Sequence, residues 1–442
     1  MKRYTIHTVL PFAAVAVLLL VCSCRPDDDE SLKPSAKKVL IVPSLDSHPM
    51  LEVATRAAND RRYGDYIEAD KYPVGTKISV SFYNSEATPA PSTTVTEATG
   101  TFEYLGNKNA LTSNSKWGST VRVEPNIYYK VFGHVPHDCC SSFTYEFSDD
   151  DANAKANTIT LNNLVPVNNT DVSVVVGVGR DHYYSDDART TNKEEEYVSG
   201  KKEIIGAYPQ KFYFLTTDKA EENTIYLLMD HLFVQTKFYF AIGADYHRLR
   251  DIRIRKIELS APEVKSLSAT VHLINNPESY KFTTAVTTAI EKIDWEMVKY
   301  QASETPGTAT KAAIYDCTKI DEPDTSGMSD TEKEAALDAY NDQKTNGFLL
   351  TETMQLVAPG FFSPLKVGDL PITFKLTTEY DVYDKKGNKI RSAESSMNYY
   401  ATKEGVEVKS GTSYDVHLTV KPTYLYQLSD GDLDNPDISV VE

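Results

Sequence analysis

The chain has 442 residues and a formal net charge of −17 at pH 7, with 28 Tyr and 16 Phe but only 2 Trp. Nucleic-acid-binding proteins carry a basic patch or stripe, and this sequence has none, so nucleic acid is excluded as a partner. The length exceeds that of one ordinary domain and suits two. Abundant tyrosine favours strands, because the ring covers a half-buried sheet face while the hydroxyl reaches water.

The first segment has the pattern of an export signal. Lys2 and Arg3 precede an apolar run from residue 9 to residue 21, which stops at Cys22-Ser23-Cys24. A short apolar run behind a positive start is typical of a signal peptide rather than of a spanning helix. The step into Cys24 resembles the lipobox of bacterial lipoproteins, which implies that residues 1–23 are removed and that Cys24 carries the lipid.

An acidic run, residues 27–30, follows the lipidation candidate within the polar segment 24–36, which we interpret as a tether. The order of cysteine and then acidic residues resembles the surface-export signal of Bacteroidetes lipoproteins. No second apolar run approaches the roughly 18 residues that a membrane helix needs. We therefore expect a bacterial cell-surface protein that contacts the outer membrane through lipid alone.

The next segment, residues 37–56, contains a short strand candidate, Val39-Leu40-Ile41-Val42. A loop-like stretch from residue 44 to residue 65 follows it and contains Arg56, Arg61 and Arg62. Regular alternation begins at Lys77, where Ile78, Val80 and Phe82 share one side and serines the other. That period of two predicts a strand with one face in water.

Further strand candidates follow at short spacing and are separated by turn-forming residues. Many short strands with such turns favour β-sandwiches, and the βαβ rhythm of a parallel sheet is missing. The candidates span residues 100–104, 120–123, 127–135, 158–161, 172–178, 211–215, 224–229, 232–241, 252–259, 269–273, 372–383, 398–401 and 414–420.

One helix is clearly predicted, over residues 334–343. Ser329-Asp-Thr-Glu332 precedes it as a capping box, and Asn346-Gly347 follows it. It lies in a polar stretch, so we interpret it as an insertion in the second domain. A charged stretch at residues 216–223 suggests the boundary between an N-terminal sandwich, 57–218, and a C-terminal one, 219–442.

The strongest metal-like cluster is His134-Val-Pro-His137-Asp-Cys139-Cys140. Two imidazoles and two thiols can hold zinc, but the spacing is not C-x-x-C, and the proline forces an extended backbone between the histidines. We therefore expect no metal site there and no disulfide framework, since the cysteines outside the signal are three. A bridge from Cys317 to Cys139 or Cys140 stays open.

Catalytic motifs are missing from the sequence: it has no G-x-S-x-G elbow, H-E-x-x-H motif, P-loop or dinucleotide fingerprint. His231 precedes a strand candidate, and we expect it to be packed at the strand start rather than to act as a base. The prediction is a protein that is not an enzyme, with no catalytic residues and no cofactor.

Four segments together with the lipoprotein signal resemble the fimbrillin family of pilin-like lipoproteins from Bacteroidetes. Val53–Ala57 resembles the family's maturation site, and Thr76–Asn84 resembles the first strand of the mature domain. Asp230–Phe240 is similar to a histidine-led strand of the second half, and Val408–Val420 to a hairpin arm near the C-terminus. Each motif is short, and their shared order gives the resemblance its weight.

The resemblance implies an all-β fold of two transthyretin-like, Greek-key β-sandwich domains. It also implies a mechanical role: an arginine-specific protease cuts the lipidated precursor, the first strand leaves, and a strand from another fimbrial subunit fills the groove. In this chain Val39, Leu40, Ile41 and Val42 are the displaced strand, and Arg56 is the cleavage site, with Arg61 and Arg62 as alternatives. The competing interpretation is a first strand that is never removed.

Two departures keep other roles open. The tail after Val420 contains Pro422 and Pro436, and proline cannot donate to a strand ladder, so the chain is expected to accept a strand more readily than to give one. A surface glycan-binding lipoprotein is the alternative function, in which Trp117 or Trp295 packs on a sugar ring.

Overall fold

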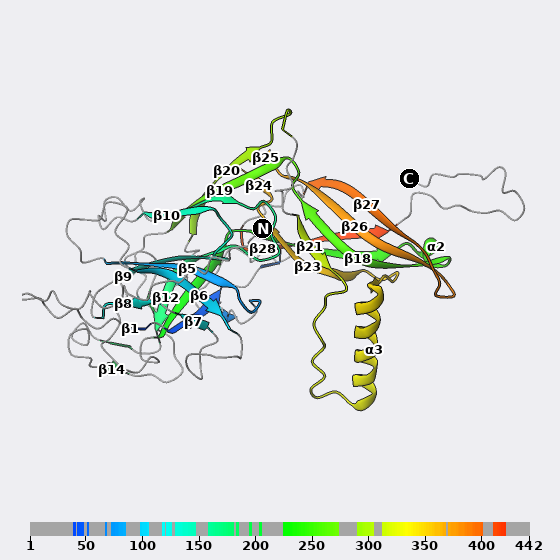
Figure 1. Cartoon of the computed structure of the whole chain (residues 1–442), viewed down its shortest axis with the longest axis horizontal. Coiled ribbons are helices and arrows are strands. Elements are labelled where there is room, and N and C mark those ends of the chain that lie inside the picture. The colour runs from blue at the N-terminus through cyan, green and yellow to red at the C-terminus, as the bar shows by residue number, and fades with distance from the viewer. Residues whose placement is uncertain are drawn as a thin grey trace, which may run out of the picture. The chain divides into compact units, whose positions relative to one another are not determined.

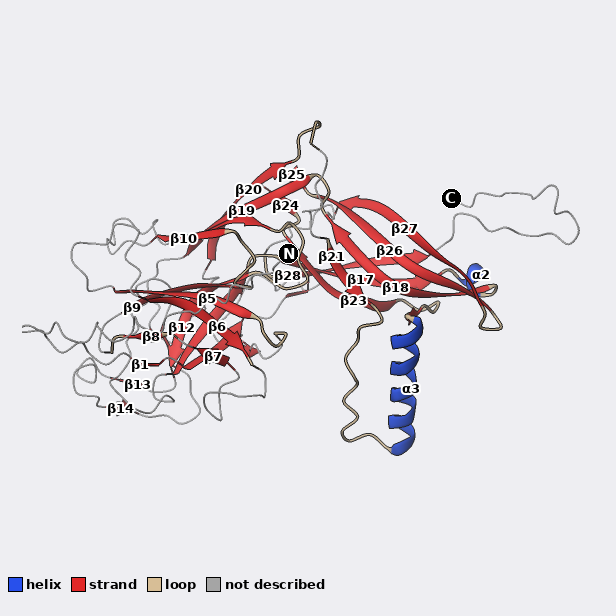
Figure 2. Ribbon diagram, in the orientation of Figure 1, coloured by secondary structure: helices blue, strands red, loops and turns tan. Residues whose placement is uncertain are grey.

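The computed structural model is built mostly of strands, as Figure 2 shows. No helix in the described part of the chain is long and apolar enough to cross a membrane. Cys24, Ile41, Arg56, Arg61 and Arg62 lie outside that part. The structure describes residues 39–40, 42–47, 51–52, 67–68, 72–84, 98–105, 117–119, 121–125, 129–146, 158–180, 183–184, 194–196, 203–205, 224–273, 290–304, 312–367, 370–400 and 410–420.

The largest sheet has nine strands in the order β4-β2-β16-β12-β9-β5-β6-β7, and β15 also pairs with β12. The pair of β2 and β16 is parallel, and the others are antiparallel. The strands are β2 (Val42–Ser47), β4 (Ile67–Glu68), β5 (Lys77–Asn84), β6 (Ala98–Tyr104), β7 (Trp117–Ser119), β9 (Tyr129–Val135), β12 (Ser173–Arg180), β15 (Glu203–Ile205) and β16 (Thr224–His231).

One face of the nine-stranded sheet encloses its own core. A cluster of buried side chains joins Phe82 of β5 to Trp117 of β7 and Leu227 of β16. Since β7 and β16 lie far apart in the strand order, the sheet has to fold over on itself to bring these side chains together. Gly133 in β9 permits the close packing, because a Cβ there would lie 2.6 Å from the carbonyl oxygen of Ser79.

The opposite face is covered by a second sheet, which we call the β19 sheet. Phe132 of β9 and Val174 of β12 pack with Ile159 and Val271 of that sheet in one cluster. The face of β5 predicted to be wet is therefore buried, and its serines are only 4% and 2% exposed. The strand order of the β19 sheet is β10-β11-β19-β20, with β10 (Ser142–Glu146), β11 (Thr158–Leu164), β19 (Val264–Leu273) and β20 (Ile290–Lys299).

Two more sheets contain most of the C-terminal strands (Figure 1). Phe238 and Phe361 of one sheet pack with Ile254 and Phe374 of the other, so the two layers share a core. The β17 sheet has the order β23-β17-β28-β3, with β3 (Leu51–Glu52), β17 (Val234–Ile242), β23 (Gln355–Ser363) and β28 (Thr412–Val420). The β18 sheet has the order β21-β18-β26-β27, with β22 on β18, and consists of β18 (Arg250–Ser260), β21 (Ala313–Asp316), β22 (Phe348–Leu349), β26 (Thr373–Asp384) and β27 (Lys389–Tyr400).

These layers confirm the predicted all-β sandwich class. The remaining described elements are short. They are the pairs β1 (Val39–Leu40) with β8 (Arg122–Val123), β13 (Tyr183–Tyr184) with β14 (Glu194–Glu196) and β24 (Lys366–Val367) with β25 (Leu370–Pro371), and the helix α2 (Ala244–His247).

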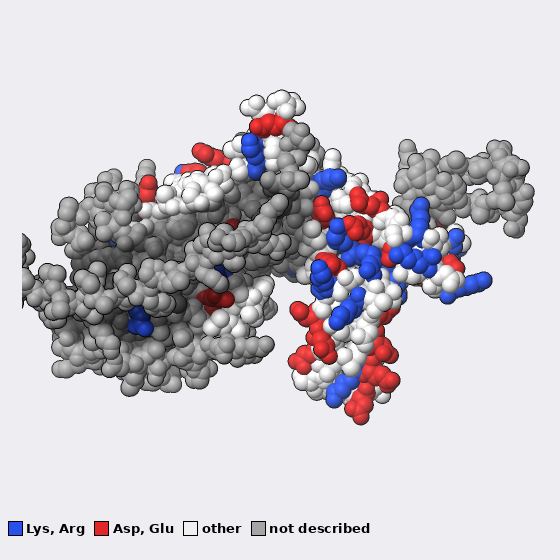
Figure 3. All heavy atoms as spheres, viewed as in Figure 1, with Lys and Arg blue, Asp and Glu red and all other residues white. Residues whose placement is uncertain are grey.

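The predicted helical insertion is α3 (Asp330–Asn346), which has no buried residue. Its capping box is present, because the Ser329 hydroxyl accepts from the backbone N–H of Glu332 and the Glu332 carboxylate accepts from that of Ser329. An Arg253–Asp342 ion pair of 2.8 Å fixes its last turns to β18. Acidic side chains dominate the surface of α3, and basic ones gather where it meets the β18 sheet (Figure 3).

Strand pairing crosses the expected boundary between residues 218 and 219. β16 lies after it and pairs with β12, and β19 lies after it and pairs with β11. Both strands complete cores of the preceding half, because Leu227 of β16 packs in the core of the nine-stranded sheet and Val271 of β19 packs against its other face. Residues 37–442 accordingly form one compact unit.

Candidate functional site

The predicted displaced strand lies at the edges of the described sheets as short segments. Val39 and Leu40 form β1 on β8, and Val42 begins β2. β2 runs parallel to β16, with Val42 opposite Thr224 and Ser47 opposite Met229. On its other side β2 pairs only with the two residues of β4. Apart from that short pair, β2 is the outermost strand on this side of the nine-stranded sheet.

β16 is the strand that β2 covers, and it is anchored independently of β2. Its side chains Ile225, Leu227 and Met229 are all 0% exposed and belong to the core. Its other edge pairs with β12 from Tyr226 to His231. Because the core and β12 both hold it, β16 can keep its place if β2 leaves.

A polar cluster adds to that anchorage at the end of β16. His231 Nδ1 is hydrogen-bonded to Asp171, and the Ser173 hydroxyl donates to the same carboxylate oxygen at 2.5 Å. In a nucleophile–base pair the serine contacts the histidine nitrogen that faces away from the carboxylate. Here Ser173 approaches Nδ1 at 3.4 Å and is 0% exposed. The three residues therefore form a buried hydrogen-bonded cluster that fixes the end of β16 and lack the geometry of a nucleophile and its base.

The N-terminal segment also reaches the β17 sheet. Leu51 and Glu52 form β3, which runs parallel to β28 opposite Thr412 and Ser413. β28 is held on its other side by β17, which pairs with it over eight positions, Gln235–Ile242 with Ser413–Val420. One short stretch of chain thus covers the edges of two sheets.

The candidate cleavage residues follow these strands along the chain. Arg56, Arg61 and Arg62 come after β3 and before β4, outside the described residues, as does the lipidation candidate Cys24. A cut at any of the three arginines would separate the same strands, β1, β2 and β3, from the rest of the chain. The predicted displaced strand, Val39–Val42, covers β1 and the first residue of β2 but not β3.

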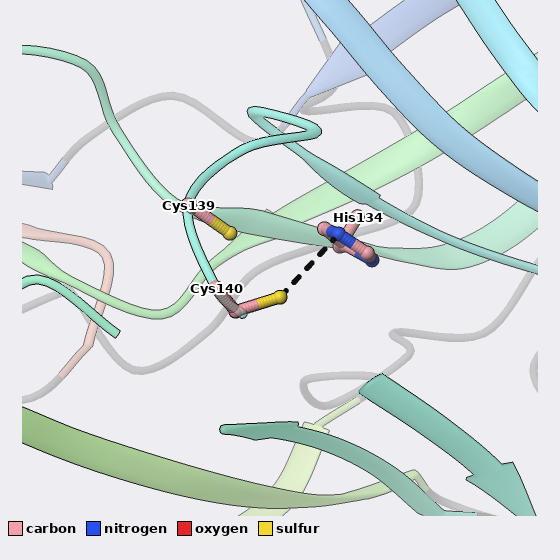
Figure 4. A group of neighbouring side chains, drawn as sticks. All are labelled: His134, Cys139 and Cys140. Atoms are coloured by element: carbon pink, nitrogen blue, oxygen red, sulfur yellow. Dashed lines mark hydrogen bonds between the residues drawn. The ribbon is translucent and has the colours of Figure 1, made fainter. Parts of the chain in front are cut away.

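The fold brings three of the four residues of the metal-like motif together (Figure 4). His134, Cys139 and Cys140 place their ligand atoms within 4.8 Å of one another. His137 turns away instead and hydrogen-bonds Ser79 at 2.5 Å. The sequence analysis weighed all four residues and expected no site; the turn after β9 is what brings three of them together.

The two thiols of this cluster differ in acidity. The pKa of Cys140 is lowered, chiefly by a hydrogen bond from Cys139 and to a smaller extent by the contact with His134. The pKa of Cys139 is raised, because it is the donor of that hydrogen bond and is buried. Both are free thiols, as is Cys317, whose pKa burial raises to about 12.

The two tryptophans weighed for glycan binding are engaged in packing. Trp117 is 3% exposed, and its ring meets Tyr104 edge-on at 5.1 Å. Trp295 on β20 is half-buried and stacks on Phe233 with ring centroids 6.0 Å apart. Trp117 is therefore not accessible to a sugar, and Trp295 is engaged with Phe233.

No protein-family model and no curated protein matches this sequence. Solved structures do match along most of its length. A candidate cell adhesion protein from Bacteroides fragilis covers 91% of this chain and 97% of its own, with 9% identity and a TM-score of 0.34. A fimbrial protein from Bacteroides vulgatus covers 90% and 99%, with 13% identity and a TM-score of 0.25. The fimbrial anchor protein Mfa2 from Porphyromonas gingivalis covers 91% and 95%, with 8% identity and a TM-score of 0.26.

These neighbours are cell adhesion and fimbrial proteins of Bacteroidetes. At these identities and TM-scores we base the proposals below on the residues and strand pairing of this chain.

Proposed function

We propose that this chain is a structural or adhesive fimbrial subunit. It is exported as an outer-membrane lipoprotein on Cys24, cut by an arginine-specific protease and joined to other subunits by strand exchange. The observation that supports this most is the position of β2, a short N-terminal strand that pairs parallel to β16 and is followed in the sequence by three arginines.

The physical basis is the chemistry of an exposed sheet edge. Without β2, β16 would present a row of unpaired backbone N–H and C=O groups, which is a template for another strand. A strand added from a neighbour would restore those hydrogen bonds, as in other cases of β-augmentation. The buried side chains of β16 and its ladder to β12 would keep the acceptor edge in shape.

The same cut would uncover a second edge. Because β3 precedes Arg56, it would leave with β2, and β28 would lose its parallel partner at Thr412 and Ser413. β28 stays paired with β17 along its length. A trimmed subunit would therefore offer a long edge on β16 and a shorter one on β28.

Limited proteolysis of the intact precursor with an arginine-specific protease tests the processing step. We expect one cut and a folded product that begins at Ala57. In the Arg56→Ala variant the cut should move to the Arg61-Arg62 pair or be lost. Digestion of the wild-type chain to small fragments, or no cut in this loop, would argue against the proposal.

A peptide-binding experiment tests the exchange step. A synthetic peptide of residues 39–47 should bind the trimmed protein and fail to bind the uncut protein, in which β2 already occupies the edge. A peptide of the same composition in scrambled order is the control. A trimmed protein that stays monomeric and binds neither peptide would overturn strand exchange while leaving the processing result intact.

A further inference from the structure

The cluster of His134, Cys139 and Cys140 lies where the chain passes from one sheet to another. His134 is the penultimate residue of β9 in the nine-stranded sheet, and both cysteines lie in the turn that leads into β10 of the β19 sheet. Figure 4 shows both thiols on the side of the turn that faces the imidazole. His134 is 0% and Cys139 3% exposed, whereas Cys140 is half-buried.

The separations suit a small tetrahedral ion. With Zn–S distances of about 2.3 Å and Zn–N distances of about 2.0–2.1 Å, tetrahedral ligand atoms lie roughly 3.5–3.8 Å apart. Cys140 Sγ and His134 Nε2 are 3.7 Å apart, within that range. All three ligand atoms lie within 4.8 Å of one another, so small rotations of the cysteine side chains would close the set.

The imidazole is already oriented by a second contact. His134 Nδ1 is hydrogen-bonded to the Tyr145 hydroxyl at 3.0 Å, which leaves Nε2 directed at the thiols. Histidines that bind metals commonly hold the ring this way, with the other nitrogen fixed by a hydrogen bond. The Phe143 ring packs edge-on against His134 at 4.7 Å and restricts its rotation further.

The donor set selects the kind of ion. Two thiolates and an imidazole favour zinc, whereas calcium and magnesium prefer oxygen ligands. Two thiolates also neutralise a divalent charge, which removes the cost of placing an ion among buried residues. Three protein ligands leave a fourth position, which the partial exposure of Cys140 opens to water.

We propose that His134, Cys139 and Cys140 form a zinc site with two thiolates, one imidazole and one open position. Zinc there would join the end of β9 to the turn before β10. It would therefore tie the nine-stranded sheet to the β19 sheet at their connection. The site is independent of processing at the arginines and of strand exchange.

Titration of the full chain with Co²⁺ under reducing, oxygen-free conditions tests the site, because Co²⁺ reports thiolate coordination in its absorption spectrum. We expect one equivalent to bind with a thiolate charge-transfer band and tetrahedral d–d bands, and Zn²⁺ to displace it. Bound zinc should also raise the melting temperature of the protein, since the folded chain holds the three ligands together and should bind zinc more tightly than the unfolded chain does.

Variants separate this site from other thiol chemistry. Cys140→Ser should lose the charge-transfer intensity of one thiolate and weaken metal binding by more than about 10-fold. Loss of a group that only hydrogen-bonds to a metal ligand already costs about 10–100-fold in metal affinity. Tyr145→Phe should keep the cobalt spectrum and bind about 10-fold more weakly. Cys317→Ser, which removes a buried thiol outside the cluster, is the matched control and should bind like the wild type.

Three outcomes would overturn the proposal. One is the absence of saturable cobalt or zinc binding by the reduced wild-type chain. Another is unchanged binding in Cys140→Ser. The third is a Cys139–Cys140 disulfide that reforms in the folded protein and prevents metal uptake, seen as a mass lower by two hydrogens and the loss of both free thiols.

Discussion

The N-terminal strands and the β26–β27 hairpin both form part of sheets, but the hairpin pairs strands that are adjacent in the sequence, whereas β2 pairs with a strand that is distant in the sequence. β26 and β27 pair over eleven positions and are connected by a tight turn, in which Asp384 and Asn388 are hydrogen-bonded at 2.9 Å and Gly387 adopts a φ of 84°. β2 pairs over six positions with β16, a partner that lies far along the chain.

This difference indicates which strands can be removed without unfolding the rest of the sheet. A hairpin closes a short loop and forms from local contacts, whereas the pairing of β2 with β16 closes a much longer loop. A long-range strand at an edge can leave without opening the turns and ladders behind it. A central strand such as β26, paired on both sides, cannot.

The largest expected local effect is on hydrogen exchange after trimming at Arg56. The β16 amides that bond to β2 should exchange roughly 100-fold faster, equivalent to about 2.8 kcal/mol of lost protection. Amides of β18 and β26 should be unchanged, since neither strand pairs with the removed segment. Equal loss in all of these strands, measured by mass spectrometry, would mean that the N-terminal strands belong to the folding core.

The largest expected effect on the stability of the whole fold comes from Phe374→Ala in β26. Phe374 is 0% exposed in the shared core, so its removal should lower the free energy of unfolding by about 3–5 kcal/mol. Urea unfolding should give this loss in both the uncut and the trimmed protein.

Met397→Ala on β27 is the matched control, because Met397 is 44% exposed and should change stability by less than about 0.5 kcal/mol. A loss at Phe374 as small as that of the control would show that the hairpin is as dispensable as the N-terminal strands.

The smallest effect is expected from Ser329→Ala, which removes the N-cap of α3. It should cost about 1 kcal/mol of local helix stability, because the N–H of Glu332 loses its acceptor. Faster exchange confined to the first turn of α3 would confirm this, and exposed Thr331→Ala serves as the control. Exchange that also rises in β18 would show that the helix supports the sheet.

The strands that sequence reasoning missed explain its limits. The sequence predicts β27 only at its end, by the candidate at residues 398–401. It exposes most of its side chains, so the rest has no alternation to detect, and it forms because β26 provides a partner along its length. β20 carries Lys292 and Asp294, whose charges resemble a loop, yet Asp294 pairs across the strands with His272 at 2.8 Å. In both strands the decisive partner lies on another segment.

The sequence by itself determined the features that depend on neighbouring residues. These include the turns, the capping box of α3 and the apolar alternation of β5. Tertiary structure decided which strands pair across long separations, as with β2 on β16 and β11 on β19. It also brought His134 to the two thiols while turning His137 toward Ser79. The physical reason is that register and burial are set by contacts between distant segments, and local patterns do not encode which segments will meet.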